Sequence, residues 1–85
     1  MEAWKVVLDE AAFQSFVSSR ASDRRKLLGA FERLRSDPQR RPDYFAKDAT
    51  GRVLSVWADR PFLITYRLDA FVSEIRIMNL QKIRY

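Results

Sequence analysis

The segment RVLSVWADRPFLITYRLDAFVSEIRIM, residues 52–78, decides the fold class of this 85-residue chain. Val, Ile, Phe, Tyr and Thr are concentrated in three runs, which predict strands over residues 52–57, 62–68 and 71–78. The ADRP and DA stretches between them are short enough for hairpin loops, which would pair Trp57 with Phe62 and Leu68 with Phe71. The segment therefore predicts an antiparallel meander, one face of which needs a cover.

A strand and an amphipathic helix are predicted at the start of the chain. Residues 4–8 (WKVVL) are short, apolar and β-branched, as in a strand, and Asp9 is a candidate N-cap for the helix that follows. Between residues 10 and 20, apolar side chains recur at spacings of three and four. They predict one apolar helix stripe, made of Ala12, Phe13, Phe16 and Val17.

A second helix is predicted from a cap at Ser22 or Asp23 to the residues before Pro38. Its inner stripe is expected to contain Leu27, Leu28, Phe31 and Leu34. Residues 38–50 show no sustained period and are predicted to be a connecting loop. The chain is thus expected to form a single small α+β domain over residues 1–85, with the order β-α-α-β-β-β. In that domain an antiparallel-rich sheet has the two N-terminal helices packed on one face.

Composition excludes several kinds of site. The chain has neither Cys nor His, which removes thiol and histidine catalysis as well as Cys/His metal sites, so we expect no metal and no cofactor. A net charge of +5, with Arg far more frequent than Lys, favours a polyanionic partner, because a guanidinium binds phosphate with two parallel hydrogen bonds. The chain has no leader-like start and no long apolar run, so a cytoplasmic protein without membrane segments is expected.

Strand alternation in the predicted meander brings arginines together on the face away from the helices. Arg52, Arg67 and Arg76 would lie within reach of one another around Glu74, and Arg60, Lys82, Arg84 and Tyr85 would extend the set. Two readings stay open for this face: a solvated surface with Arg–Glu pairs, or a phosphate-binding site. A rival basic surface lies in residues 20–41, which hold eight basic and three acidic residues. That surface is either a solvated helix face or a contact site for phosphate or an acidic protein.

Four stretches in order resemble the RelE/ParE superfamily of toxins from bacterial type II toxin–antitoxin systems: WKVVL (4–8), FERLRSDP (31–38), FLITYRLD (62–69) and IRIMNLQKIRY (75–85). The resemblance implies a small sheet backed by two helices, and an acidic antitoxin protein that wraps the toxin. For the RelE-like branch it implies metal-independent cleavage of mRNA on translating ribosomes, as an endoribonuclease. For the ParE-like branch it implies inhibition of DNA gyrase.

The same resemblance implies catalytic positions. Arg76, Lys82 and Tyr85 match the family's arrangement of basic residues with a C-terminal aromatic, whereas Arg60 is only near the family's catalytic arginine, whose place is taken by Phe62. The missing histidines and the replacement of the usual pattern by residues 79–82 (NLQK) keep a third reading open, a catalytically degenerate binding module.

The chemistry of RNA cleavage suggests a role for each candidate. Attack by a 2′-hydroxyl needs a base, positive charge on the phosphorane and an acid for the leaving oxygen, and arginine can supply only the charge. Lys82 is the candidate base, with Lys47 or Glu74 in reserve. Tyr85 is either a hydrophobic plug or a stacking platform for an RNA base, and in this mechanism it is expected to stack. The residues expected to bind RNA are Arg52, Arg67, Arg84 and Lys47.

Overall fold

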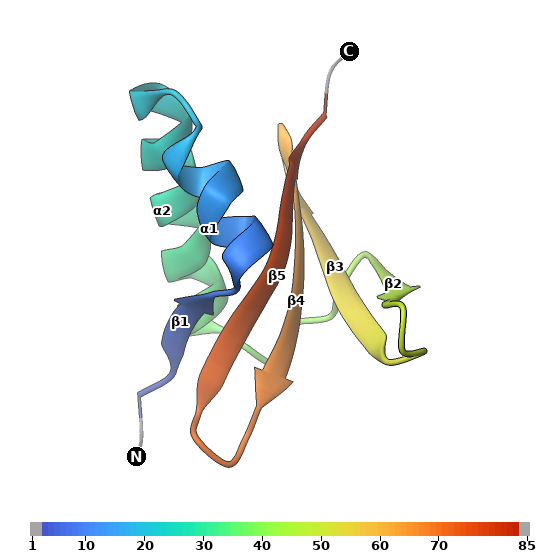
Figure 1. Ribbon diagram of the computed structural model, residues 1–85. Helices are drawn as coiled ribbons and strands as arrows, with labels where there is room; N and C mark the ends of the chain where they lie inside the picture. The colour runs from blue at the N-terminus through green and yellow to red at the C-terminus, as the bar shows by residue number, and fades with distance from the viewer. Residues whose placement is uncertain (1–2, 84–85) are drawn as a thin grey trace.

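A five-stranded sheet forms the centre of the molecule, and two helices pack on one of its faces (Figure 1). The computed structural model describes residues 3–83. In chain order the elements are β1 (Lys5–Leu8), α1 (Glu10–Val17), α2 (Ala21–Ser36), β2 (Tyr44–Lys47), β3 (Val53–Asp59), β4 (Phe62–Asp69) and β5 (Glu74–Lys82). The predicted α+β class, with both helices near the N-terminus, is confirmed.

The strands lie in the order β1-β5-β4-β3-β2. Three neighbouring pairs are antiparallel, and only β1 runs parallel to its neighbour β5. This parallel pair becomes possible because the chain crosses over the sheet through α1 and α2 before it returns. Neither helix in residues 3–83 is long and apolar enough to cross a membrane.

Strand β2 corrects the prediction of a continuous loop over residues 38–50. Tyr44–Lys47 pairs antiparallel with β3, with Tyr44 opposite Val56 and Lys47 opposite Val53. The turn between them is closed by Asp48, whose carboxylate accepts hydrogen bonds from the backbone N–H groups of Thr50 and Arg52 at 2.9 Å. Four residues are too few to show a period, so this edge strand left no pattern in the sequence.

Both predicted hairpin pairings are wrong in register but right in face. Phe62 pairs with Asp59 rather than Trp57, across the turn formed by Arg60 and Pro61. Leu68 pairs with Ile75 rather than Phe71, across a longer turn over residues 70–73. Each error is an even number of residues, and side chains alternate with a period of two. The predicted division of the strand side chains between the inner and outer faces is therefore correct.

The core lies between the sheet and the helices. Its fully buried members include Ile64, Tyr66, Ile75 and Ile77 from the strands and Ala12, Leu27, Ala30 and Leu34 from the helices. The predicted helix stripes are only partly buried, because Phe13, Val17 and Leu28 are each about half exposed. Helix α2 also begins before the predicted caps: Arg20 is its N-cap residue, and Asp23 lies buried in the first turn.

A β-bulge between β4 and β5 changes which way the end of β5 faces. Tyr66 is opposite Ile77, but its neighbour Thr65 is opposite Asn79, so Met78 is an extra residue. Before the bulge, Ile75 and Ile77 point to the helices, and after it Leu80 does so. The bulge thereby turns Lys82 towards the helices as well, whereas unbroken alternation would have placed it on the face of Arg76, about 20 Å further along the strand.

Candidate nucleic-acid interface

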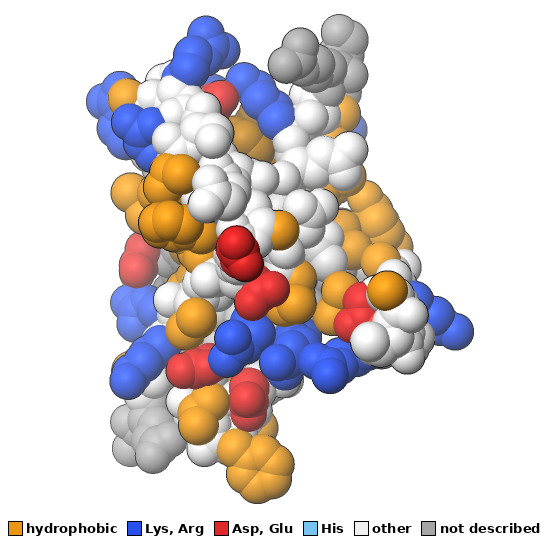
Figure 2. Space-filling model, in the orientation of Figure 1, with side chains coloured by type: hydrophobic (Ala, Val, Ile, Leu, Met, Phe, Trp, Pro, Cys, Tyr) orange, Lys and Arg blue, Asp and Glu red, His pale blue; other side chains and the backbone are white. Residues whose placement is uncertain are grey.

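Arg67 and Arg76 are direct neighbours on adjacent strands, on the sheet face that points away from the helices. Figure 2, in the orientation of Figure 1, shows Lys and Arg side chains in a band across the lower half of the molecule. The lower parts of β5 and β4 lie at the level of this band. Glu74 lies beside them, and Arg76 Nη2 donates to Glu74 Oε1 at 3.1 Å. The predicted grouping of these two arginines around Glu74 is present.

The Nε atoms of Arg67 and Arg76 are buried, and neither has a hydrogen-bond partner within residues 3–83. A buried donor without an acceptor is unfavourable by about 1–3 kcal/mol, so such groups are rare unless a ligand or water satisfies them. Two adjacent guanidiniums are also the kind of groups that bind an oxyanion with several acceptor oxygens, such as a phosphate. Glu74 neutralises only part of this charge.

The other predicted RNA-binding residues are less closely grouped. Arg52 is exposed in the turn that Asp48 closes, immediately before β3. Lys47 is opposite Val53, so strand alternation places it towards the helix side of the sheet rather than beside Arg67. Arg84 falls outside the described residues, as does Tyr85.

Tyr44 is a residue of this face that the sequence did not single out. It is opposite Val56, which in turn is opposite Thr65, so it shares the face of Arg67. Its side chain is 48% exposed, and two strand spacings place β2 about 10 Å from β4. If residues 44–47 had been predicted as a strand paired with β3, strand alternation would have placed Tyr44 on the face of Arg67.

Lys82 is not brought together with Arg76. Its Nζ donates to Asp23 Oδ2 of helix α2 at 2.9 Å, on the helix side of the sheet. The Asp23 side chain is only 10% exposed, and its hydrogen bond from Lys82 holds the pKa of Asp23 below its ordinary value. Lys82 therefore forms an ion pair on the helix side of the sheet, away from the face of Arg67 and Arg76.

Arg60 lies in the β3–β4 turn, at the opposite end of β4 from Arg67. The four candidates Arg60, Arg67, Arg76 and Lys82 thus divide into two groups, at different ends of the sheet. Within the described part of the chain, no three acidic residues come together in a way that could hold a metal ion.

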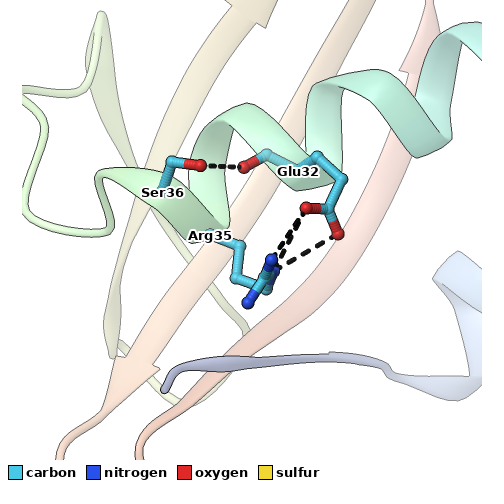
Figure 3. A network of polar contacts seen from close by, with 3 residues as sticks. All are labelled: Glu32, Arg35 and Ser36. Atoms are coloured by element: carbon cyan, nitrogen blue, oxygen red, sulfur yellow. Dashed lines mark hydrogen bonds and ion pairs between the residues drawn. The ribbon is translucent and has the colours of Figure 1, made fainter. Parts of the chain in front are cut away.

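The rival basic surface on α2 is partly neutralised. Arg35 donates to both carboxylate oxygens of Glu32, and the Ser36 hydroxyl donates to the Glu32 carbonyl at 2.9 Å (Figure 3). The hydrogen bond from Arg35 lowers the pKa of Glu32. Arg33 is paired with Asp59 of β3. The cations that remain on α2 are at its N-terminal end.

Comparisons with known proteins identify the fold. No protein-family model and no curated protein sequence matches the chain. The structure is similar to RelE in the archaeal RelE–RelB complex from Pyrococcus horikoshii, with a TM-score of 0.70, 14% identity, and 95% of this chain and 96% of that chain covered. It is also similar to the isolated E. coli RelE toxin, with a TM-score of 0.69, 14% identity, and coverage of 98% and 87%.

The intact E. coli RelBE toxin–antitoxin complex contains a third similar chain, with a TM-score of 0.63, 14% identity, and coverage of 98% and 100%. At this identity the similarity concerns the fold. The resemblance expected from the sequence is confirmed at that level: the chain has the RelE fold.

Proposed function

Because the chain has the RelE fold, we propose that it is the toxin of a type II toxin–antitoxin pair, and that it binds RNA through the face of Arg67 and Arg76. The observation that carries the proposal is the direct pairing of Arg67 with Arg76 across β4 and β5, on the sheet face away from the helices. A phosphate of single-stranded RNA offers several acceptor oxygens to two adjacent guanidiniums.

Two further residues support RNA as the polyanion. Arg52 adds an exposed cation at the β2–β3 turn. Tyr44 provides an exposed ring on the same face, and nucleobases stack on such rings with about 1–3 kcal/mol each. A surface that joins guanidiniums to an aromatic ring suits a flexible strand whose bases are unpaired.

We propose mRNA on translating ribosomes as the substrate, with Arg76 and Arg67 stabilising the charge of the phosphorane. Glu74 is the carboxylate next to Arg76 and so is the candidate base on this face. Lys82 is left out of this proposed site, because its ion pair with Asp23 holds it on the other side of the sheet. Tyr85 and Arg84 keep their proposed roles in stacking and RNA binding, and an acidic antitoxin segment that is disordered alone is the proposed inhibitor.

A second candidate function, a binding module without catalysis, is favoured by the bulge between β4 and β5. Lys82 already lies about 20 Å beyond Arg76 along β5, and the bulge turns it to the other face, so the residues that the sequence proposed as base and charge stabiliser do not meet. Such a module would retain RNA binding and lack cleavage.

One experiment separates these functions from gyrase inhibition. The protein is induced in cells, mRNA 5′ ends are mapped and gyrase activity is assayed in parallel, for the wild type and for an R67A/R76A variant. The proposal expects new mRNA ends that disappear in the double variant and persist in R25A, which removes an exposed arginine from α2. Intact mRNA with inhibited gyrase would contradict it, and loss of cleavage in R25A alone would move the site to α2.

A further inference from the structure

A cavity of about 230 Å³ lies at the end of the molecule where the α1–α2 connection meets the last residues of β5. Leu27, Phe62 and Leu80 provide apolar lining from α2, β4 and β5. The ion pair of Asp23 and Lys82 lines it too, together with Ser15, Ser18 and Ser19. None of these residues belongs to the face of Arg67 and Arg76.

The ion pair in this cavity presents a donor beside an acceptor with two oxygens. Lys82 Nζ contacts Asp23 Oδ2 at 2.9 Å, and the Lys82 side chain remains 39% exposed. The Asp23 carboxylate is nine-tenths buried and stays ionised at neutral pH, because the hydrogen bond from Lys82 lowers its pKa. An ionised carboxylate only accepts hydrogen bonds, and two parallel N–H donors fit it best.

This order of groups matches one nucleobase. The Watson–Crick edge of guanine presents an acceptor, O6, followed by two donors, N1–H and N2–H, whereas cytosine presents a donor and two acceptors and adenine begins with a donor. Uracil offers a single donor between two acceptors. We propose that the cavity binds a guanine base, with Lys82 donating to O6 and Asp23 accepting from N1–H and N2–H.

The size and the lining of the cavity fit this ligand. Pockets for drug-sized molecules measure about 300–1,000 Å³, so a smaller cavity suits a fragment such as one base. The apolar side chains Leu27, Phe62 and Leu80 give the flat ring a dry contact surface, and a few polar groups then set its orientation. The Ser19 hydroxyl donates to the Ser15 carbonyl at 2.7 Å, which leaves its oxygen as an acceptor near the ligand.

The guanine comes either from an RNA strand or from a free nucleotide. The RNA source rests on the proposed function, whereas the chemistry of the cavity does not. In the RNA case the cavity would read one base, and the distant face of Arg67 and Arg76 would hold the backbone.

The test is a titration of the full chain with GMP, IMP, UMP, AMP and CMP, followed by NMR of the backbone amides. GMP is expected to bind about tenfold or more tightly than AMP and CMP, the discrimination that a bidentate contact to a base edge provides. IMP and UMP each offer Asp23 one donor, so their affinities are expected to lie between that of GMP and those of AMP and CMP. The amides that shift should be those of the cavity and not those of Arg67 and Arg76.

Variants identify the groups responsible. D23N is expected to abolish the preference for GMP, because an amide presents a donor where guanine also has one, and K82M to weaken it. D59N is the matched control, since Asp59 also pairs with a cation across the two layers but does not line the cavity. Equal binding of all five nucleotides by the wild type, or a guanine preference that survives D23N, would overturn the proposal. The nucleotide series needs no variant, so a D23N chain that fails to fold leaves the test decisive.

Further measurements separate the sources and the two proposals. Single-stranded RNA pentamers with one central G or one central A are compared with the free nucleotides. A preference for G in the pentamers supports RNA as the source, and a preference confined to mononucleotides supports a free nucleotide. The R67A/R76A variant should lose RNA affinity and keep its preference for GMP. The experiment can therefore contradict the proposed RNA site without contradicting the guanine site, and the reverse.

Discussion

Glu74 competes with RNA for Arg76 in the proposed site. The carboxylate accepts a hydrogen bond from Arg76 Nη2, and both side chains are about one-quarter to one-third exposed, at 24% and 30%. A phosphate bound to Arg76 must share it with this carboxylate and is also repelled by it. Glu74, the candidate base, is therefore also a residue that weakens RNA binding.

We expect E74Q to bind single-stranded RNA about two- to fivefold more tightly, on the scale of a partly exposed ion pair. Cleavage by this variant should fall if Glu74 is the base, so kcat decreases while KM improves. Fluorescence anisotropy and a cleavage assay measure the two effects. E32Q, which removes the carboxylate paired with Arg35 on α2 (Figure 3), should change neither. Weaker RNA binding by E74Q would show that the carboxylate orients Arg76 rather than competing with the phosphate.

The ion pair of Asp23 and Lys82 gives the fold a dependence on pH. The hydrogen bond from Lys82 lowers the pKa of Asp23 below its ordinary 3.8, so the native chain binds this proton less readily than the unfolded chain. The stabilisation is fully present above pH 3.8 and is lost as the pH falls through the native pKa. D23N should therefore be less stable than the wild type at pH 7. The difference between their free energies of unfolding should become smaller in acid.

Urea denaturation of both chains between pH 2 and pH 7 measures this gap. K82M should show the same narrowing, because it removes the other half of the pair. A difference in unfolding free energy that stays constant across this pH range would contradict the assignment of the pH dependence to the ion pair of Asp23 and Lys82.

At the scale of single residues, the sequence predicted which side chains share a sheet face better than it predicted which partners they contact. Arg67, Arg76 and Glu74 are grouped as expected, since strand alternation depends only on parity and the register errors are even. The partners of Lys82 were not predictable, because Asp23 is 59 residues away and one extra residue in β5 decides on which side Lys82 lies.

Among the elements, α2 has one strongly buried stripe and one exposed edge. Leu34 is completely buried in the core, whereas Leu28 on the same helix is 52% exposed. The apolar spacing in the sequence included both, because a period of 3.6 cannot distinguish the centre of a stripe from its margin.

We expect L34A to lower the free energy of unfolding by about 2–5 kcal/mol, since the core loses apolar contacts and retains a cavity. L28A should change it by about 0.5 kcal/mol, which is the usual range for surface positions. Chemical denaturation monitored by circular dichroism gives both values. Equal losses in the two variants would show that α2 packs with a different face inward.

Helices and long strands were predictable as elements, and β2 and the bulge were not. The helices repeat an apolar period over eight and sixteen residues, whereas β2 has four residues at a sheet edge, where the pairing with β3 decides its conformation. A bulge reflects the fit between two whole strands, so neither strand encodes it alone.

For the molecule as a whole, the position of the basic residues predicts how binding responds to salt. Arg52, Arg67 and Arg76 would contact about three phosphates, and each contact with a single strand contributes about −0.7 to the slope of log K against log salt concentration. The expected slope is about −2. R67A should make it less steep by about 0.7, and R25A should leave it unchanged. An affinity that does not vary between 50 and 300 mM salt would refute the phosphate site.

The parallel pairing of β1 with β5 has a consequence for synthesis of the chain. Residues 5–8 pair with residues 74–77, and β5 also pairs with β4, so the strand between β1 and β4 is made after the other four strands of the sheet. A ribosome-bound chain can form its helices and the hairpin of β3 and β4 early, but β1 has no strand beside it until β5 emerges from the exit tunnel. Ile75 and Ile77, both fully buried, arrive equally late. The two arginines of the proposed site also lie on β4 and β5, so the nascent chain can form the proposed phosphate-binding face only after β5 has left the exit tunnel.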